Sequence, residues 1–228
     1  MKRGSTWRGI TIGRFSISFT LILGFLVLVA STLFNFVTSE LIKYLYPDRP
    51  VVPDLLFTIL PFVPWLQYVF DTILAASIIL MLVYAFRIDW RHSGYYFFVV
   101  GVGYLVRAVL MALTPLGQPV GNNETMGIGL LLNIYQHGMF PSGHTCLAAT
   151  IYFLMDRALA PRMKTAAGIL VIAEMVCLLL SHAHYSIDLV GGLMVAYLIV
   201  HWLKRYKEHF LVSLPAGTPR RRTAPRRR

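Results

Sequence analysis

Charged residues are scarce in this chain, and acidic residues are the scarcer kind. Only 14% of its 228 residues are charged, and 10 of these are acidic, whereas 57% are hydrophobic and the mean hydropathy is +0.63. A typical soluble domain carries about 25% charged residues, so this composition excludes an ordinary water-soluble fold. Cysteine is also rare: Cys146 and Cys177 both lie in apolar stretches, without the spacing of a redox or zinc motif. We expect both to be packing residues in a membrane protein.

Six apolar stretches approach the length of about 20 residues that a membrane-spanning helix needs. They lie at 16–38, 66–86, 93–115, 142–160, 165–183 and 186–203. The chain is therefore predicted to be an all-α polytopic membrane protein, a six-transmembrane-helix bundle. The first stretch is longer than a signal-peptide core and is expected to be retained. The predicted organisation is a short N-terminus (1–15), a membrane domain (16–203) and a basic tail (204–228).

The basic residues indicate which ends of these helices share a side of the membrane. Of the 21 Lys and Arg residues, 18 lie before the first stretch, after the sixth, or in the turns that follow the second and fourth. Only Lys43 and Arg49 lie in the remaining loops, and Arg107 lies within a stretch. The positive-inside rule then predicts that both termini are cytoplasmic and that the loops 39–65 and 116–141 are extracytoplasmic.

The tail from residue 204 onward carries nine of the 21 Lys and Arg residues. Its low complexity predicts disorder and attraction to anionic lipid. Nucleic acid is not an expected partner, because the segment from Thr218 to Arg228 has no aromatic residues for base stacking and is attached to a membrane domain.

Two polar clusters, forty residues apart, return to the same predicted membrane level. His144 follows a Pro-Ser-Gly turn at the outer start of the fourth stretch, and His184 and Asp188 lie at the outer start of the sixth. Their i, i+4 spacing allows the carboxylate to accept the imidazole N–H and to make the other ring nitrogen more basic. His184 is therefore the candidate nucleophile, Asp188 its support, and His144 the candidate acid for a leaving oxygen. Ionisable residues in a membrane are costly and usually functional.

Other interpretations of these polar residues stay open. A single histidine of this kind is more often a satisfied polar residue at a helix end, and it is the meeting of two histidines and an aspartate at one level that favours function. A zinc site of His182, His184 and Asp188 would lack a fourth ligand, so no metal or other cofactor is expected. Arg107 is a candidate phosphate-binding residue, unless it pairs with Asp188 or Glu174 for structure alone. Glu174 itself is expected to be a packing or hydrogen-bonded carboxyl.

The motifs resemble those of a known lipid-enzyme superfamily. Pro-Ser-Gly-His-Thr at 141–145 and His-Tyr-Ser-Ile-Asp at 184–188 resemble two signatures of the type-2 phosphatidic acid phosphatase (PAP2) superfamily. Residues 49–55 are similar to the proline-rich PLPD segment of its sphingomyelin synthase-related branch, and residues 104–114 to the YxxRxxxMxxT segment of that branch. The chain departs from the branch at 136–138, where Gln-His-Gly replaces Cys-Gly-Asp.

The resemblance implies a PAP2-like bundle in which His184 attacks the phosphorus of a lipid phosphoester, Asp188 supports it and His144 protonates the leaving lipid alcohol. Expected substrate or phosphate contacts, by motif or by side of the membrane, come from Arg107, Ser142, Gly143, Tyr185, Tyr104, Asp54 and Glu124. Nothing resembles the GxSxG elbow that a serine nucleophile would need. A lipid-facing mouth is expected from Pro53, Leu55, Tyr104 and Met111. Asp54 and Tyr104 are expected to favour transfer over hydrolysis, unless they serve loop capping and packing.

The function implied is that of a lipid phosphotransferase, which moves a phospho-head group from a glycerophospholipid to a lipid alcohol of the ceramide or diacylglycerol class. A lipid phosphate phosphatase or phospholipase C-like hydrolase uses the same chemistry and is the alternative. A channel or transporter is disfavoured, because the polar residues cluster at one level and do not line several helices. The sequence leaves the head group, the acceptor and the oligomeric state open, a homo-oligomer included.

Overall fold

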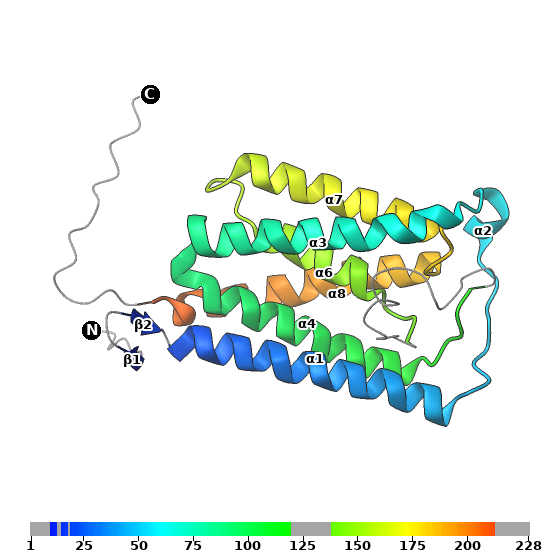
Figure 1. Cartoon of the computed structure of the whole chain (residues 1–228), viewed down its shortest axis with the longest axis horizontal. Helices are drawn as coiled ribbons and strands as arrows, with labels where there is room; N and C mark the ends of the chain where they lie inside the picture. Colours follow the sequence, from blue (N-terminus) through cyan, green and yellow to red (C-terminus); the bar gives the residue numbers. More distant parts are fainter. Residues whose placement is uncertain (1–9, 13–14, 18, 120–137, 213–228) are drawn as a thin grey trace.

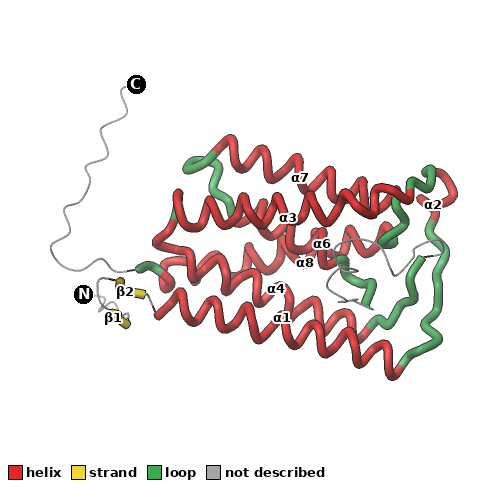
Figure 2. Tube along the Cα trace, in the orientation of Figure 1, coloured by secondary structure: helices red, strands yellow, loops and turns green. Residues whose placement is uncertain are grey.

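The computed structural model describes residues 10–12, 15–17, 19–119 and 138–212 (Figure 1). Most of this part of the chain is helical (Figure 2). The longer helices are α1 (Phe19–Leu45), α3 (Gln67–Val83), α4 (Ser93–Leu113), α6 (Gly143–Leu154), α7 (Pro161–Leu180) and α8 (Ser186–Leu203). The short helical segments are α2 (Leu55–Ile59), η1 (Pro64–Leu66), η2 (Tyr84–Ile88), η3 (Trp90–His92) and η4 (Lys204–Phe210). A hairpin of β1 (Ile10–Ile12) and β2 (Phe15–Ile17) precedes α1.

Five helical segments are long and apolar enough to cross a membrane, which fits an integral membrane protein. They are Phe19–Leu45, Pro64–Ile88, Trp90–Leu113, Pro161–Leu180 and Ser186–Phe210. The remaining predicted span, 142–160, contains α6, which has only 12 residues and is about 18 Å long. The all-α membrane bundle is confirmed, but one of its six helices is shorter than the sequence predicted.

The early end of α6 reflects turn chemistry that hydropathy does not register. The Asp156 carboxylate accepts the backbone N–H of Ala158 at 2.8 Å, a local turn that competes with helix continuation. Pro161 then begins α7 as its first residue, a position where proline is favoured. The apolar residues from 155 to 160 therefore join two helices and do not extend α6.

The boundaries of the first loop also differ from the prediction. Helix α1 continues to Leu45 instead of ending near residue 38, because Ser39 and Ile42 are buried in the bundle and extend its packed face. The outer loop expected at 39–65 therefore begins after Leu45, and it contains α2.

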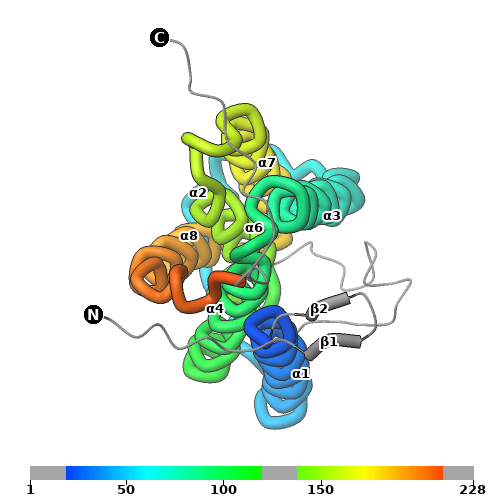
Figure 3. The backbone as a smooth tube through the Cα atoms, turned by 90° about the vertical axis from the view of Figure 1, so that its left-hand side faces the viewer, coloured from blue at the N-terminus to red at the C-terminus, as the bar shows by residue number. Residues whose placement is uncertain are grey.

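Helix α6 lies at the centre of the bundle, with α3, α4, α7 and α8 around it and α1 on the outside of α4 (Figure 3). The close approach of α1 and α4 requires small residues, because a Cβ atom added to Gly24 or to Gly94 would overlap the backbone of the other helix. The start of α1 and the end of α8 lie at one end of the bundle, and α2 lies at the other (Figure 1).

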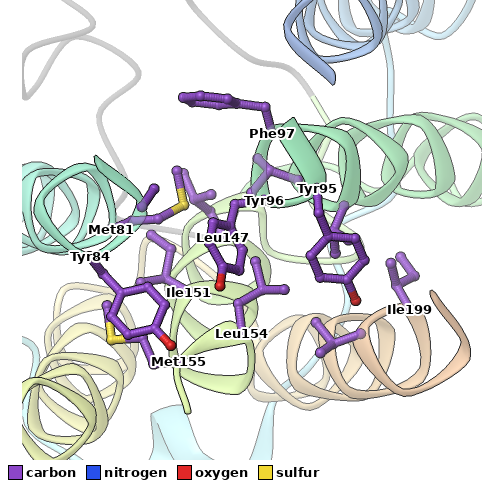
Figure 4. Packing of buried hydrophobic residues seen from close by; sticks show 14 of the residues in the cluster. Met81, Tyr84, Tyr95, Tyr96, Phe97, Leu147, Ile151, Leu154, Met155 and Ile199 are labelled. Atoms are coloured by element: carbon purple, nitrogen blue, oxygen red, sulfur yellow. The ribbon is translucent and has the colours of Figure 1, made fainter. Parts of the chain in front are cut away.

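The main apolar core lies toward the end where α1 begins, and includes Tyr84, Tyr95 and Tyr96 (Figure 4). A polar cluster closes this end: Asp89 accepts from Tyr96 and, at 2.8 Å, from Lys207, and its carboxylate lies 2.7 Å from His92 Nδ1. Burial alone would raise the pKa of Asp89, but these three hydrogen bonds lower it below its ordinary value. The cluster fixes η4 to the turn between α3 and α4, far from the candidate catalytic residues.

Candidate active site

The candidate catalytic residues gather at the end of the bundle where α3 and α6 begin and where α7 turns into α8. The Nδ1 atom of His184 lies 3.2 Å from Oδ2 of Asp188, and only 9% of the His184 side chain and none of the Asp188 side chain is exposed. His184 precedes α8, and Asp188 lies in its first turn, where the same oxygen accepts the Tyr185 N–H at 3.0 Å. The structure therefore brings the predicted pair together through a capped helix start.

Burial is the strongest influence on His184, and it lowers the pKa of the imidazole below its ordinary 6.5. The hydrogen bond and charge of Asp188 raise this pKa, while His144 and Arg107 lower it further. The net effect is a neutral ring at neutral pH. With Nδ1–H directed at Asp188, the lone pair is on Nε2, as a nucleophile requires.

His144 lies in the first turn of α6, and its ring centroid is 6.3 Å from that of His184. Its Nε2 atom lies 3.1 Å from Oδ1 of Asp71, a residue of α3. The sequence analysis missed Asp71. The available signal was an acidic residue within the predicted span 66–86, since such residues are costly in a bilayer and usually functional.

Arg107 is buried, with 2% of its surface exposed, and it holds the turn that precedes α6. Its Nε–H donates to the carbonyl of Pro141 at 3.1 Å, and its two Nη atoms donate to the Gly138 carbonyl at 3.2 Å and to Asn35 Oδ1 at 2.7 Å. These contacts use three of its five N–H groups. The structural alternatives considered for Arg107 are not formed, because neither Asp188 nor Glu174 accepts a hydrogen bond from it in the described part of the chain.

The turn itself is built from Ser142 and Gly143. Ser142 is fully buried; its hydroxyl accepts the Thr145 N–H at 3.3 Å, and its own N–H donates to the Asp188 carbonyl at 3.0 Å. Ser142 is therefore an N-cap that joins α6 to α8. A Cβ atom on Gly143 would lie 2.8 Å from Arg107 Nε, so glycine lets the guanidinium reach the start of α6.

Two further candidate residues tie the loops after α1 and after α4 to α8. The Tyr185 hydroxyl donates to the Gly117 carbonyl at 3.1 Å and accepts the Val52 N–H at 3.3 Å. Asp54 caps α2, and its carboxylate accepts the Ser186 N–H at 2.6 Å and the Ser186 hydroxyl at 3.1 Å. Both contacts attach loops to the segment that carries His184, and no substrate contact follows from them.

The remaining candidates are distributed differently from the prediction. Tyr104 borders a small cavity between α4 and α6 together with Arg107 and Gly143. Met111 is completely buried beneath Gly138, whose missing Cβ lets the turn rest on it, so the mouth predicted for a lipid acceptor does not include Met111. Leu55 is 74% exposed. Glu124, with the apolar stretch that follows it, lies outside the described residues.

Glu174 and His182 lie beside the candidate catalytic residues. Glu174 is fully buried, and neither carboxylate oxygen has a hydrogen-bond partner among the described residues, so of the two expected roles it has the packing one there. The His182 ring stacks on Phe57 at 4.0 Å between centroids. Within the described ranges, no three His, Cys, Asp or Glu side chains are grouped as metal ligands would be, so the zinc alternative is not assembled there.

Comparison with known proteins agrees with the motifs. Residues 139–206 match the model of the PAP2 superfamily C-terminal family. This segment is therefore similar to the C-terminal part of PAP2 proteins. The phosphatidylcholine:ceramide cholinephosphotransferase 1 of Caenorhabditis elegans is 25% identical to the chain in an alignment 201 residues long, which covers 74% of this chain and 43% of that protein. The chain thus spans less than half the length of this relative. The predicted PAP2 and sphingomyelin synthase-related resemblance is confirmed.

The segment that matches the PAP2 model contains His144, His184 and Asp188, but helices before it complete their surroundings. Asp71 comes from α3 and Arg107 from α4. The candidate active site is therefore built from the matched segment and from the preceding half of the chain.

Proposed function

We propose that this chain is a lipid phosphotransferase that moves the phospho-head group of a glycerophospholipid to a lipid alcohol through a phosphohistidine at His184. The observation that carries the proposal is the pair of imidazoles with centroids 6.3 Å apart, each held by a carboxylate from the protein. Two such rings can act on opposite sides of one phosphorus atom. The C. elegans relative is named for phosphatidylcholine and ceramide, and these classes supply the first substrates to test.

In the first step, the Nε2 lone pair of His184 attacks the phosphorus and forms an N–P bond. The bond between phosphorus and the glycerolipid oxygen breaks, and its electron pair goes to that oxygen. His144 donates a proton to the oxygen through the ring nitrogen that is not paired with Asp71, so diacylglycerol leaves as a neutral alcohol. Asp188 stabilises the positive charge that develops on the His184 ring.

In the second step, His144 acts as a base. It takes the proton of the acceptor hydroxyl as the acceptor oxygen attacks phosphorus, the N–P bond breaks, and its electron pair returns to Nε2 of His184. The new phosphodiester leaves, and both histidines are restored. Water in place of the lipid alcohol would give hydrolysis by the same atoms.

Charge stabilisation is the main requirement of phosphoryl transfer, and two groups supply it here. The Arg107 guanidinium lies against the start of α6, close enough to His184 to influence its pKa. The first N–H groups of α6 have no partner within the helix and carry its positive dipole end. Together they favour negative phosphoryl oxygens beside His144.

The test uses purified protein with head-group-labelled phosphatidylcholine or phosphatidylethanolamine, with and without ceramide or another lipid alcohol. We expect labelled transfer product only when the acceptor is present, and base-stable, acid-labile label on the protein when the acceptor is omitted. His184→Asn is the control, because it keeps an amide of similar size but cannot form the intermediate. Water-derived product alone, with every lipid alcohol supplied, would assign the chain to the hydrolase alternative.

A further inference from the structure

The end of the bundle opposite the candidate active site holds a second, basic cavity of about 730 Å³. Four cationic side chains line it, from the turn after α6, the start of α7 and the start of η4: Arg157, Lys164, Lys204 and Lys207. Asp156 is the one acidic residue in this lining. A cavity with this excess of positive charge favours an anionic ligand.

The cavity exists because the central helix is short. α6 ends at Leu154, while its neighbours α7 and α8 continue past that level, and Tyr95, Leu154 and Met155 form part of the cavity wall (Figure 4). The Lys164 ammonium donates to the carbonyls of Tyr152 at 2.6 Å and Met155 at 2.9 Å. These bonds cap the end of α6 and hold a positive charge at the edge of the cavity.

Two of the four cations lack a partner of their own. Lys207 is paired with Asp89 at 2.8 Å, and Lys164 is held by carbonyls. Arg157 and Lys204 are exposed and form no hydrogen bond or ion pair within the described part of the chain. The sequence after Val212 contains six arginines and no acidic residue, so its charge does not complement this cavity.

A second hollow, of about 920 Å³, continues from the basic cavity and shares Phe153, Arg157 and Lys164 with it. It runs between α6 and α7 and is lined mostly by apolar side chains, with Ile169 and Ile172 63% and 66% exposed. From Lys164 to Ile172 the path along α7 is about 12 Å. The two hollows together suit an anionic group joined to a hydrocarbon chain.

We propose that these two hollows bind one anionic phospholipid, with its phosphate between Arg157 and Lys204 and an acyl chain in the groove between α6 and α7. This site is at the opposite end of the bundle from His184 and does not depend on the chemistry proposed there. A zwitterionic lipid would bring a second, positive group into a cavity that is already basic. Inorganic phosphate would satisfy only the basic cavity.

The proposal can be tested on the full chain in a neutral detergent by titration with fluorescent phosphatidylglycerol and with phosphatidylcholine of the same acyl chains. Wild type should bind phosphatidylglycerol at least 10-fold more tightly. Arg157→Gln with Lys204→Gln should weaken this binding roughly 30-fold. Each Lys or Arg beside anionic lipid contributes about 1 kcal/mol, so two contribute about 2 kcal/mol, and every 1.4 kcal/mol is a factor of ten in affinity. Arg87→Gln with Arg162→Gln removes the same charge at the same end, outside the cavity, and should change it less than threefold.

The acyl chain has its own test. Gly168→Leu fills the groove, because even a Cβ atom there would lie 3.2 Å from the Tyr152 ring, and it should weaken phosphatidylglycerol binding at least threefold. Ala166→Leu, on the exposed face of α7, should not. If the two double variants weakened phosphatidylglycerol binding equally, the proposed site would be wrong. It would also be wrong if excess inorganic phosphate displaced the lipid fully and Gly168→Leu bound the lipid as tightly as wild type.

Discussion

The Nε2 atom of His144 lies 3.1 Å from Oδ1 of Asp71, so the candidate acid is oriented by a carboxylate from another helix. Asp71→Asn should lower turnover roughly 10- to 100-fold, a part of the 10²–10⁴ that a positioned acid or base contributes. Glu174→Gln is the matched control: it neutralises a buried acid that has no hydrogen bond in the described chain, and turnover should stay within about threefold. The measurements are kcat, KM and the midpoint of thermal unfolding for each variant. A larger loss of turnover for Glu174→Gln than for Asp71→Asn would contradict the role of Asp71.

The two histidines should be separable by the leaving group of the substrate. His144→Ala and His184→Ala should each lower turnover by roughly 10³-fold or more, and the double variant should be no worse, because both act in one step. A phosphodiester with a nitrophenol leaving group needs no proton in the first step, so the single-turnover release of nitrophenolate should be restored in His144→Ala and not in His184→Ala. Rescue of both variants would remove His184 from the nucleophile role.

The pH dependence follows from the depressed pKa of His184. Because only the neutral ring attacks, the acid limb of kcat/KM should lie below pH 6.5. Asp188 raises this pKa, so Asp188→Asn should move the limb to still lower pH while reducing the rate. The same depression makes the His184 contribution to stability present above pH 6.5 and lost as pH falls through the folded-state pKa. The test is kcat/KM measured against pH, on both sides of pH 6.5, for wild type and Asp188→Asn. A shift of the acid limb to higher pH in Asp188→Asn would refute the prediction.

Asp54 should control access of water through the loop that it ties to Ser186. Asp54→Ala removes both hydrogen bonds to Ser186, so the loop before α3 should loosen and the ratio of transferred to water-released head group should fall. Asp48→Ala, an exposed acid in the same loop, is the matched control and should leave the ratio unchanged. An equal ratio in wild type and both variants would assign Asp54 to capping alone.

The charge distribution predicts that the active site faces away from the cytoplasm. Val51→Cys and Leu159→Cys give thiols at opposite ends, at positions that are each 53% exposed, and both native cysteines are buried. In intact cells an impermeant thiol reagent should label Val51→Cys, and Leu159→Cys only after permeabilisation. Labelling of both from one side would refute the predicted topology.

The sequence was sufficient for most of the helices and for the proximity of the three motif residues, because both depend on local pattern. Hydropathy detects apolar stretches, and counting alternate crossings of the membrane places His144 and His184 at one level. The sequence did not predict the end of α6, which depends on the Asp156 turn. It also did not predict the contact of Asp71, which depends on how α3 packs against α6. The partners of Arg107 were also beyond its reach, since two of the three are backbone carbonyls that only the folded turn brings together.

The bond between Arg107 and Asn35 has a consequence for biogenesis. An arginine within an apolar helix is costly to insert into a bilayer unless an acceptor is at hand. During synthesis α1 emerges before α4, whereas Gly138 and Pro141 emerge after it, so Asn35 is the first of the three acceptors to become available. Helix α1 thus provides α4 with a polar partner at the moment of membrane insertion, before the turn that precedes α6 has been translated.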